Sequence, residues 1–170
     1  MNMFALLAEG FRYPRPGRRE MLARGHAALP HGPVRTAVGR FLRAVEPLSL
    51  AAWEELYTRT FDLNPLVAPY LGFHRWGESY ARGDFMAKLN ARYRQLGIPT
   101  DGELPDHLVP VFRYLAADEA PLPELPEVLE VGLKAMHRAL AKADADNPYL
   151  LLLEAARQAA GTLAKQPAGG

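Results

Sequence analysis

The sequence contains no cysteine, and this absence excludes several kinds of chemistry. Disulfides, thiolate metal sites, iron–sulfur clusters and cysteine nucleophiles all require a thiol, so this chain can build none of them. A chain without disulfides is also compatible with a reducing compartment such as the cytoplasm. Its function must therefore rest on the remaining polar, charged and aromatic residues.

A strong net charge and a long apolar run are missing as well. The formal net charge is +1 over 170 residues, so bulk charge indicates neither nucleic acid nor an acidic lipid surface as partner. Apolar runs such as Tyr149 to Leu153 are far shorter than the roughly 20 residues that cross a bilayer. Neither the apolar stretch from Met1 to Leu7 nor Arg18-Arg19 has the pattern of an export signal. We expect a soluble, cytoplasmic protein without membrane insertion.

Familiar catalytic motifs are also absent from the sequence. It has no glycine-rich dinucleotide loop after a strand, no P-loop, no H-E-x-x-H and no G-x-S-x-G. None of the five histidines stands at a metal-ligand spacing from another histidine or an acid: His26, His31, His74, His107 and His137. We therefore predict no metal site, no catalytic residue and no enzyme.

Helical periodicity dominates what is present. Apolar residues recur at three- and four-residue spacing along most of the chain, as in Val34, Val38, Phe41, Leu42 and Val45. No stretch alternates as a strand would, and the apolar content of 49% is enough for a packed core. The sequence predicts an all-α fold, a single compact helical domain of about nine helices over residues 1–165, with a flexible tail at 166–170.

Prolines, glycines and capping residues predict where the helices end. Ser49 and the pair Asn147-Pro148 are typical starts of the fourth and last helices. The stretch Arg82-Gly83-Asp84 is expected to separate the fifth helix from the sixth, with Asp84 as a cap. A stiff extended connector is expected at Pro121, Pro123 and Pro126.

Charges of opposite sign gather in different parts of the chain. Arginines crowd the first quarter, namely Arg12, Arg15, Arg18, Arg19, Arg24, Arg35, Arg40 and Arg43. Acids crowd residues 101–130, namely Asp101, Glu103, Asp106, Asp118, Glu119, Glu124, Glu127 and Glu130, opposed only by Arg113. Two interpretations remain open: two solvated faces that attract each other, or an acidic surface that receives a basic partner peptide.

The run Glu103-Leu-Pro-Asp-His107 is the most informative short segment. Asp106 follows Pro105 and is placed to cap a helix that begins there, with His107 in its first turn. Adjacent helical residues point about 100° apart, so Asp106 and His107 do not form a ready acid–base pair. A structural cap, a peptide- or cofactor-binding position and a small acid–base enzyme all remain possible at this point.

A second segment combines aromatic residues with an acid. Tyr57 and Phe61 lie one helical turn apart on the face of Trp53, so core packing is their default role. Asp62 follows, and a carboxylate near a helix C-terminus is disfavoured by the macrodipole, so it either caps the next turn or meets a cation. Tyr70 and Trp76 add aromatic rings on the next helix. A groove with aromatic walls and acidic edges would suit an amphipathic helix carrying arginines.

Four stretches in order carry a resemblance to a known family. They are Leu6-Leu7 to Tyr13-Pro14; Tyr57-x-x-x-Phe61-Asp62; Tyr70-Leu71 with Gly77, Arg82-Gly83, Leu89, Tyr93 and Gly97; and Glu103-Leu-Pro-Asp-His-Leu108. This ordered set resembles the respiratory nitrate reductase assembly chaperones, the delta-subunit or NarJ family, within the wider group that includes TorD and DmsD. The chain departs from the family pattern at Val109-Pro110 and at Arg113, where an acid is usual.

The resemblance implies an all-helical chaperone without catalysis. Such proteins bind the N-terminal leader of a molybdoenzyme catalytic subunit, here that of a nitrate reductase, and hold it in the cytoplasm until molybdopterin guanine dinucleotide is inserted. The client handles that cofactor, and the chaperone keeps none. The chaperone itself is expected to be a monomer or a dimer.

The peptide-binding residues predicted from the resemblance and from the aromatic groove are Tyr57, Phe61, Asp62, Tyr70, Trp76, Glu103, Pro105, Asp106 and His107. In this hypothesis Asp62, Glu103 and Asp106 meet basic residues of the leader, and His107 hydrogen-bonds it or responds to protonation. The alternative is a nucleic-acid-binding helical module that uses the arginine-rich first quarter.

Overall fold

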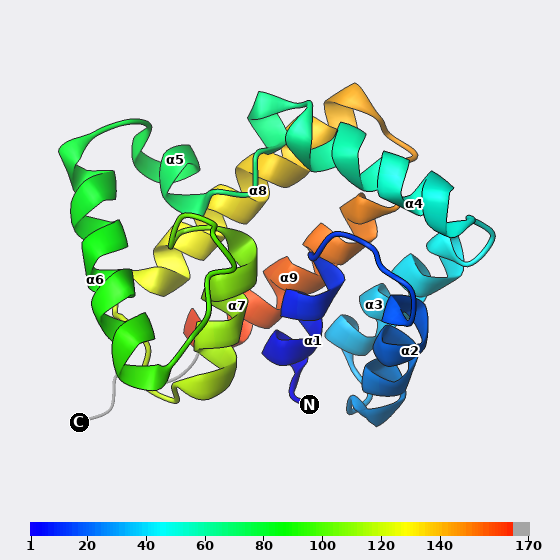
Figure 1. Ribbon diagram of the computed structural model, residues 1–170, viewed down its shortest axis with the longest axis horizontal. Coiled ribbons are helices and arrows are strands. Elements are labelled where there is room, and N and C mark those ends of the chain that lie inside the picture. The colour runs from blue at the N-terminus through cyan, green and yellow to red at the C-terminus, as the bar shows by residue number, and fades with distance from the viewer. Residues whose placement is uncertain (165–170) are drawn as a thin grey trace.

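The computed structural model describes residues 1–164, and these form helices joined by short loops (Figure 1). Within that range the elements are α1 (Met3–Gly10), α2 (Arg18–Ala28), α3 (Pro33–Val45), α4 (Leu50–Tyr57), the π-turn η1 (Thr58–Asp62), the 3-10 turn η2 (Pro65–Val67), α5 (Leu71–Trp76), α6 (Tyr80–Leu96), α7 (Leu108–Ala117), α8 (Leu125–Ala143) and α9 (Tyr149–Ala164). The predicted all-α fold of about nine helices is confirmed over the described chain. Lys165 and the predicted flexible tail, 166–170, lie outside it.

Two long helices near the C-terminus organise the packing. α9 packs against α3 and α8, while α1 packs against α7 and α5 against α8. In Figure 1, α6 lies at one edge of the molecule beside α5, and α2 and α3 lie at the opposite edge. Segments from both ends of the sequence therefore share one core. None of the helices in the part that the structure describes is long and apolar enough to cross a membrane.

Aromatic side chains fill the centre of this core. The ring of Phe11 stacks on that of Phe112 with centroids 5.9 Å apart, which joins α1 to α7. Tyr149 lies at the start of α9, and its ring centroid is 4.9 Å from that of Phe61. Its hydroxyl accepts a hydrogen bond from the Trp53 indole at 3.0 Å. Both polar atoms of that buried pair are thus satisfied, as burial requires. These contacts fix the end of α4 and η1 against the C-terminal helix.

Two of the predicted helix starts are confirmed by capping bonds. The Ser49 hydroxyl accepts from the amide of Ala52 at 3.1 Å, and the Asn147 side chain accepts from the amide of Tyr149 at 2.9 Å. Each bond satisfies an amide that has no partner within the helix.

The predicted break at Arg82-Gly83-Asp84 is wrong. Those residues lie inside α6, and the chain turns instead at Gly77, whose φ of +64° suits glycine and ends α5. The connector before α8 is also shorter than predicted, because Pro126 lies in the first turn of that helix, where proline removes no helical hydrogen bond.

Candidate functional site

The two motif segments meet through their backbones. The amide of Leu71 donates to the carbonyl of Asp106, and the amide of Leu108 donates to the carbonyl of Pro69, both at 2.9 Å. These bonds make an isolated antiparallel bridge between Tyr70 and His107. The two rings lie 5.3 Å apart, nearly perpendicular. Residues far apart in sequence therefore form one wall.

A cleft of about 590 Å³ opens beside this bridge. It gathers six predicted site residues, namely Tyr57, Phe61, Asp62, Tyr70, Glu103 and His107. It is also lined by residues that the prediction missed: Arg12, Tyr13, Arg15, Pro65, Ala68, Pro69, Thr100, Asp101 and Val109. Three predicted residues, Trp76, Pro105 and Asp106, do not line it.

The floor of the cleft is aromatic and follows a change of helix type. After α4 the chain widens into the π-turn, where the amide of Leu63 bonds the carbonyl of Thr58 at 3.1 Å. Tyr57 and Phe61 lie 5.0 Å apart and are 8% and 4% exposed, so they belong to the core as well as to the cleft. The Tyr57 hydroxyl donates to the carbonyl of Phe11 at 3.0 Å, and burial raises its pKa. Turns of this kind occur often at functional sites.

Asp62 and Glu103 form an acidic lip on the cleft. Partial burial and the nearby charge of Glu103 raise the pKa of Asp62. Glu103 accepts a hydrogen bond from the Tyr70 hydroxyl at 2.6 Å, and among residues 1–164 neither carboxylate forms an ion pair. The turn after Asp62 is capped by Asn64, whose side chain accepts from the amide of Leu66. Of the two roles considered for Asp62, capping of the following turn is thus filled by Asn64, and contact with a cation stays a prediction.

Exposed leucines flank the acidic lip. Leu63 and Leu66, on either side of the cleft residue Pro65, are 71% and 70% exposed. Leu104 follows Glu103 and is 47% exposed. Exposed apolar side chains beside a polar rim are typical of protein interaction sites. The combination can receive a segment that is apolar on one face and basic on its edge.

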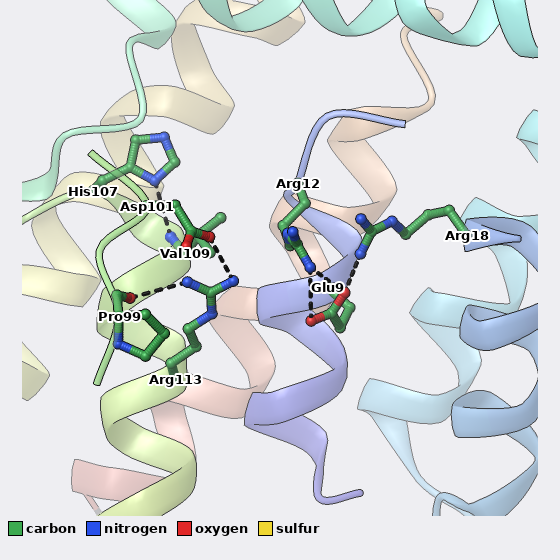
Figure 2. Close-up of polar contacts among 8 residues, drawn as sticks. All are labelled: Glu9, Arg12, Arg18, Pro99, Asp101, His107, Val109 and Arg113. Carbon is green, nitrogen blue, oxygen red and sulfur yellow. Dashed lines mark hydrogen bonds and ion pairs between the residues drawn. The ribbon is translucent and has the colours of Figure 1, made fainter. Parts of the chain in front are cut away.

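His107, rather than Asp106, caps α7. Its Nδ1 accepts from the amide of Val109 at 3.1 Å, as Figure 2 shows, so a neutral ring carries its proton on Nε2. His107 is 5% exposed, and burial lowers the pKa of its ring. The negative charges of Glu103 and Asp106 act in the opposite direction but have a smaller effect. The prediction that Asp106 caps this helix is wrong.

Asp106 is instead the centre of a buried ion pair. Its carboxylate, 0% exposed, accepts from Arg82 Nε at 2.9 Å, from Arg82 Nη2 at 3.3 Å and from the amide of Gly72 at 3.1 Å. These bonds tie α5 and α6 to the loop before α7 and satisfy an amide at the start of α5. Asp106 therefore has no exposed charge for a partner, contrary to the expectation that it meets basic leader residues.

Pro105 and Trp76 are structural residues outside the cleft. The buried Pro105 accepts a hydrogen bond from the Tyr93 hydroxyl at 2.7 Å, which anchors the loop to α6. Trp76 packs on Phe85 of α6 at 5.2 Å, with Arg75 over its ring at 5.5 Å. The predicted place of Trp76 in the groove is corrected, because the last turn of α5 faces α6.

Another wall of the cleft comes from the segment after α1. The Tyr13 ring packs on Tyr57 at 5.4 Å, and Arg12 and Arg15 stand beside it in the cleft. Figure 2 shows Glu9 between Arg12 and Arg18, bonded to both. Tyr13 belongs to the first resemblance stretch, and the arginine-rich composition was visible in sequence. No local sequence signal predicted that these residues line the same cleft as Tyr70, however.

Arg113, which departs from the family pattern, anchors the loop of the acidic segment. It pairs with Asp101 at 2.8 Å and donates to the carbonyl of Pro99 at 2.9 Å (Figure 2). The Arg113 hydrogen bond lowers the pKa of Asp101, and Arg12 and Arg15 act in the same direction. Asp101 has a φ of +55° and precedes Gly102 at +82°, so the ion pair holds a tight turn.

The nucleic-acid alternative receives no support from the arginines. Arg18 is buried against Glu9. Arg19 donates to the carbonyls of Val45 and Leu48, and Arg35 donates to that of Leu29. Arginines that bond helix ends and the partly buried carboxylate of Glu9 are not available as one cationic face. The described residues also contain no cluster of three or more potential ligands that could hold a metal ion.

Comparison with curated proteins finds that part of this chain is similar to nitrate reductase assembly chaperones. Over 107 residues, 62% of this chain, the sequence is 36% identical to the nitrate reductase molybdenum cofactor assembly chaperone NarJ of Escherichia coli strain K12. The match to NarJ of Escherichia coli O157:H7 has the same extent and identity. The resemblance inferred from the motifs is thereby confirmed.

The extent of the match is limited on the side of the relatives. It spans 42% of their length, which is less than half. No family model matches the chain. Both relatives are named as chaperones rather than enzymes, in agreement with the prediction that this chain is not an enzyme.

Proposed function

We propose that this protein is an assembly chaperone for a nitrate reductase. It binds the N-terminal leader of the catalytic subunit in the cleft beside the Tyr70–His107 bridge and holds the subunit in the cytoplasm until its molybdenum cofactor is inserted. The observation that carries the proposal is the meeting of the two motif segments at one cleft, in a chain similar to NarJ. The client handles molybdopterin guanine dinucleotide, and the chaperone acts as a monomer or a dimer.

The cleft supplies the chemistry that a leader helix needs. Tyr57, Phe61 and Tyr70 offer an aromatic floor for apolar side chains, and the acidic lip attracts a basic residue. A micromolar complex requires about 8 kcal/mol. Three or four buried aliphatic or aromatic side chains at about 2 kcal/mol each reach that scale before ordering opposes them. Apolar anchors therefore provide the affinity, and the charges provide orientation.

Calorimetric titration with a synthetic leader peptide, beside a scrambled peptide of equal composition, tests the proposal. We expect saturable micromolar binding of the leader alone. The variant Tyr70→Ala should bind about tenfold or more weakly, since it removes an aromatic wall. Tyr80→Ala is the matched control, because Tyr80 is 96% exposed and lies outside the cleft. A folded protein that ignores the leader, or equal losses in both variants, would contradict the proposal.

A further inference from the structure

The charges around the cleft are divided between its walls rather than uniformly acidic. One wall carries the acidic lip, Asp62 and Glu103, and the wall from the segment after α1 carries Arg12 and Arg15, here called the basic wall. We infer that the cleft accepts a dipolar peptide in one orientation, with a cationic side chain over the acidic lip and a carboxylate over the basic wall. This inference rests on the proposed function and names the charge pattern of its partner.

Within residues 1–164 the acidic lip forms no ion pair. Asp62 is exposed, and the Glu103 carboxylate accepts a hydrogen bond only from the neutral Tyr70 hydroxyl among the contacts of the described chain. Asp106, which lies outside the cleft, is already paired with Arg82. The raised pKa of Asp62 reflects burial and repulsion by Glu103, without an offsetting arginine. A ligand cation placed here would relieve that repulsion.

The basic wall has the opposite imbalance. Arg12 and Arg18 share one carboxylate, that of Glu9, as Figure 2 shows. Arg15 is exposed. Burial of Arg18 is the main cause that lowers the pKa of Arg18, and the nearby charges of Arg12 and Arg15 lower it further. The third acid that lines the cleft, Asp101, is held by Arg113 at 2.8 Å. The basic wall therefore carries an excess of positive charge, whereas the acidic lip carries an excess of negative charge.

This division selects the partner. A uniformly basic segment would be attracted by the acidic lip and repelled by the basic wall. A polyanion such as nucleic acid would be repelled by the acidic lip and attracted by the basic wall. Only a segment with both signs, in the matching order, is attracted at both walls. Like-charge contact discriminates strongly against the wrong order. The apolar floor and the exposed leucines between them accommodate its apolar face.

Two designed amphipathic peptides of about 15 residues, a length near the limit for an isolated helix, test this polarity. They share one apolar face and one composition, with a lysine near one end and a glutamate near the other, and differ only in exchanging these two residues. Calorimetry at low salt should show that one order binds about tenfold more tightly than the other.

The decisive variant is the double exchange Asp62→Arg with Arg15→Glu, which leaves the net charge unchanged and should reverse the preferred peptide order. The two peptides keep the same intrinsic difference in helicity with either protein. A reversed preference between them therefore reports the charges of the cleft. The control Asp84→Arg with Arg24→Glu makes the same exchange at exposed positions outside the cleft and should preserve the wild-type preference.

Equal affinity for both orders, an unreversed preference, or binding of neither designed peptide would overturn the inference. The leader titration decides the proposed function separately. If the leader binds but order has no effect, the chaperone proposal stands without this polarity.

Discussion

Asp62 and Asp106 carry the same side chain in opposite environments. Asp62 is exposed on the cleft beside Glu103, whereas Asp106 is fully buried and bonded by Arg82 and Gly72. The first is available to a partner and the second is not. Substitutions at the two positions should therefore separate binding from stability.

Replacing Asp106 by alanine should strongly destabilise the fold. It leaves the Arg82 guanidinium, 12% exposed, without its partner, and breaking a buried pair typically costs about 3–5 kcal/mol. Denaturant unfolding followed by circular dichroism measures the change. Asp84→Ala, at an exposed site on the same helix as Arg82, is the control and should remain within about 0.5 kcal/mol. Wild-type stability of Asp106→Ala would show that the pair is unimportant.

The Asp62 carboxylate should lower the stability of the fold at neutral pH. Its pKa is raised in the folded protein, so the folded state binds the proton more tightly than the unfolded state. The penalty is present above that raised pKa and disappears as pH falls through it. Asp62→Asn should therefore be more stable at pH 7, by less than about 0.5 kcal/mol at this exposed site, and no more stable in acid. Unfolding curves across pH test this, and a less stable variant at pH 7 would refute it.

At the scale of elements, the cleft depends on how closely α5 approaches the loop before α7. A Cβ built on Gly72 would lie 2.7 Å from Asp106 Oδ2 and 3.1 Å from Arg82 Cγ. No side chain fits there without moving the ion pair. The glycine thus permits the backbone approach on which the Tyr70–His107 bridge depends.

Gly72→Ala should destabilise by about 1–3 kcal/mol through overpacking. Gly83→Ala, inside α6 with open space around its Cβ, is the matched control and should stabilise by up to about 1 kcal/mol. Thermal unfolding of both variants gives the comparison. Similar melting temperatures for the two would show that the contact at Gly72 is readily relaxed.

Local signals predicted some elements and missed others for identifiable reasons. The caps at Ser49 and Asn147 were predicted correctly because capping involves residues a few positions apart. The prediction of a helix break near Gly83 was wrong because a helix tolerates an interior glycine. The local sequence does not distinguish Gly83 from Gly77, where the chain turns. Trp76 was misplaced because its orientation depends on α6, which lies later in the chain.

At the scale of the whole molecule, opposite charges distant in sequence meet around one cleft. The basic wall follows α1, the lip residue Asp62 ends the π-turn, and Glu103 lies in the loop before α7. The first interpretation of the charge asymmetry, attraction between the two charged groups, applies at Asp101, whereas a basic partner at the acidic lip stays a prediction. Arg12 and Arg15 act on Asp101, while Asp62 and Glu103 keep a surplus of negative charge.

Binding of a leader should weaken as salt increases, because exposed charges are screened beyond about 8–10 Å at physiological ionic strength. We expect affinity to fall steadily between low and high sodium chloride in calorimetric titrations. The double variant Asp62→Asn with Glu103→Gln should show a shallower salt dependence. An affinity independent of salt would argue against charge recognition at the acidic lip and leave the apolar floor as its basis.

The sequence by itself determined the helical class, the exclusion of thiol chemistry and the segments that form the site. Helical periodicity, composition and motifs are local properties, which sequence displays directly. Only the tertiary structure decided that Asp106 turns inward while His107 caps α7, and that Arg12 and Arg15 line the same cleft as the acidic lip. Those outcomes depend on contacts between helices distant in sequence, where burial and packing select one partner among several that local chemistry permits.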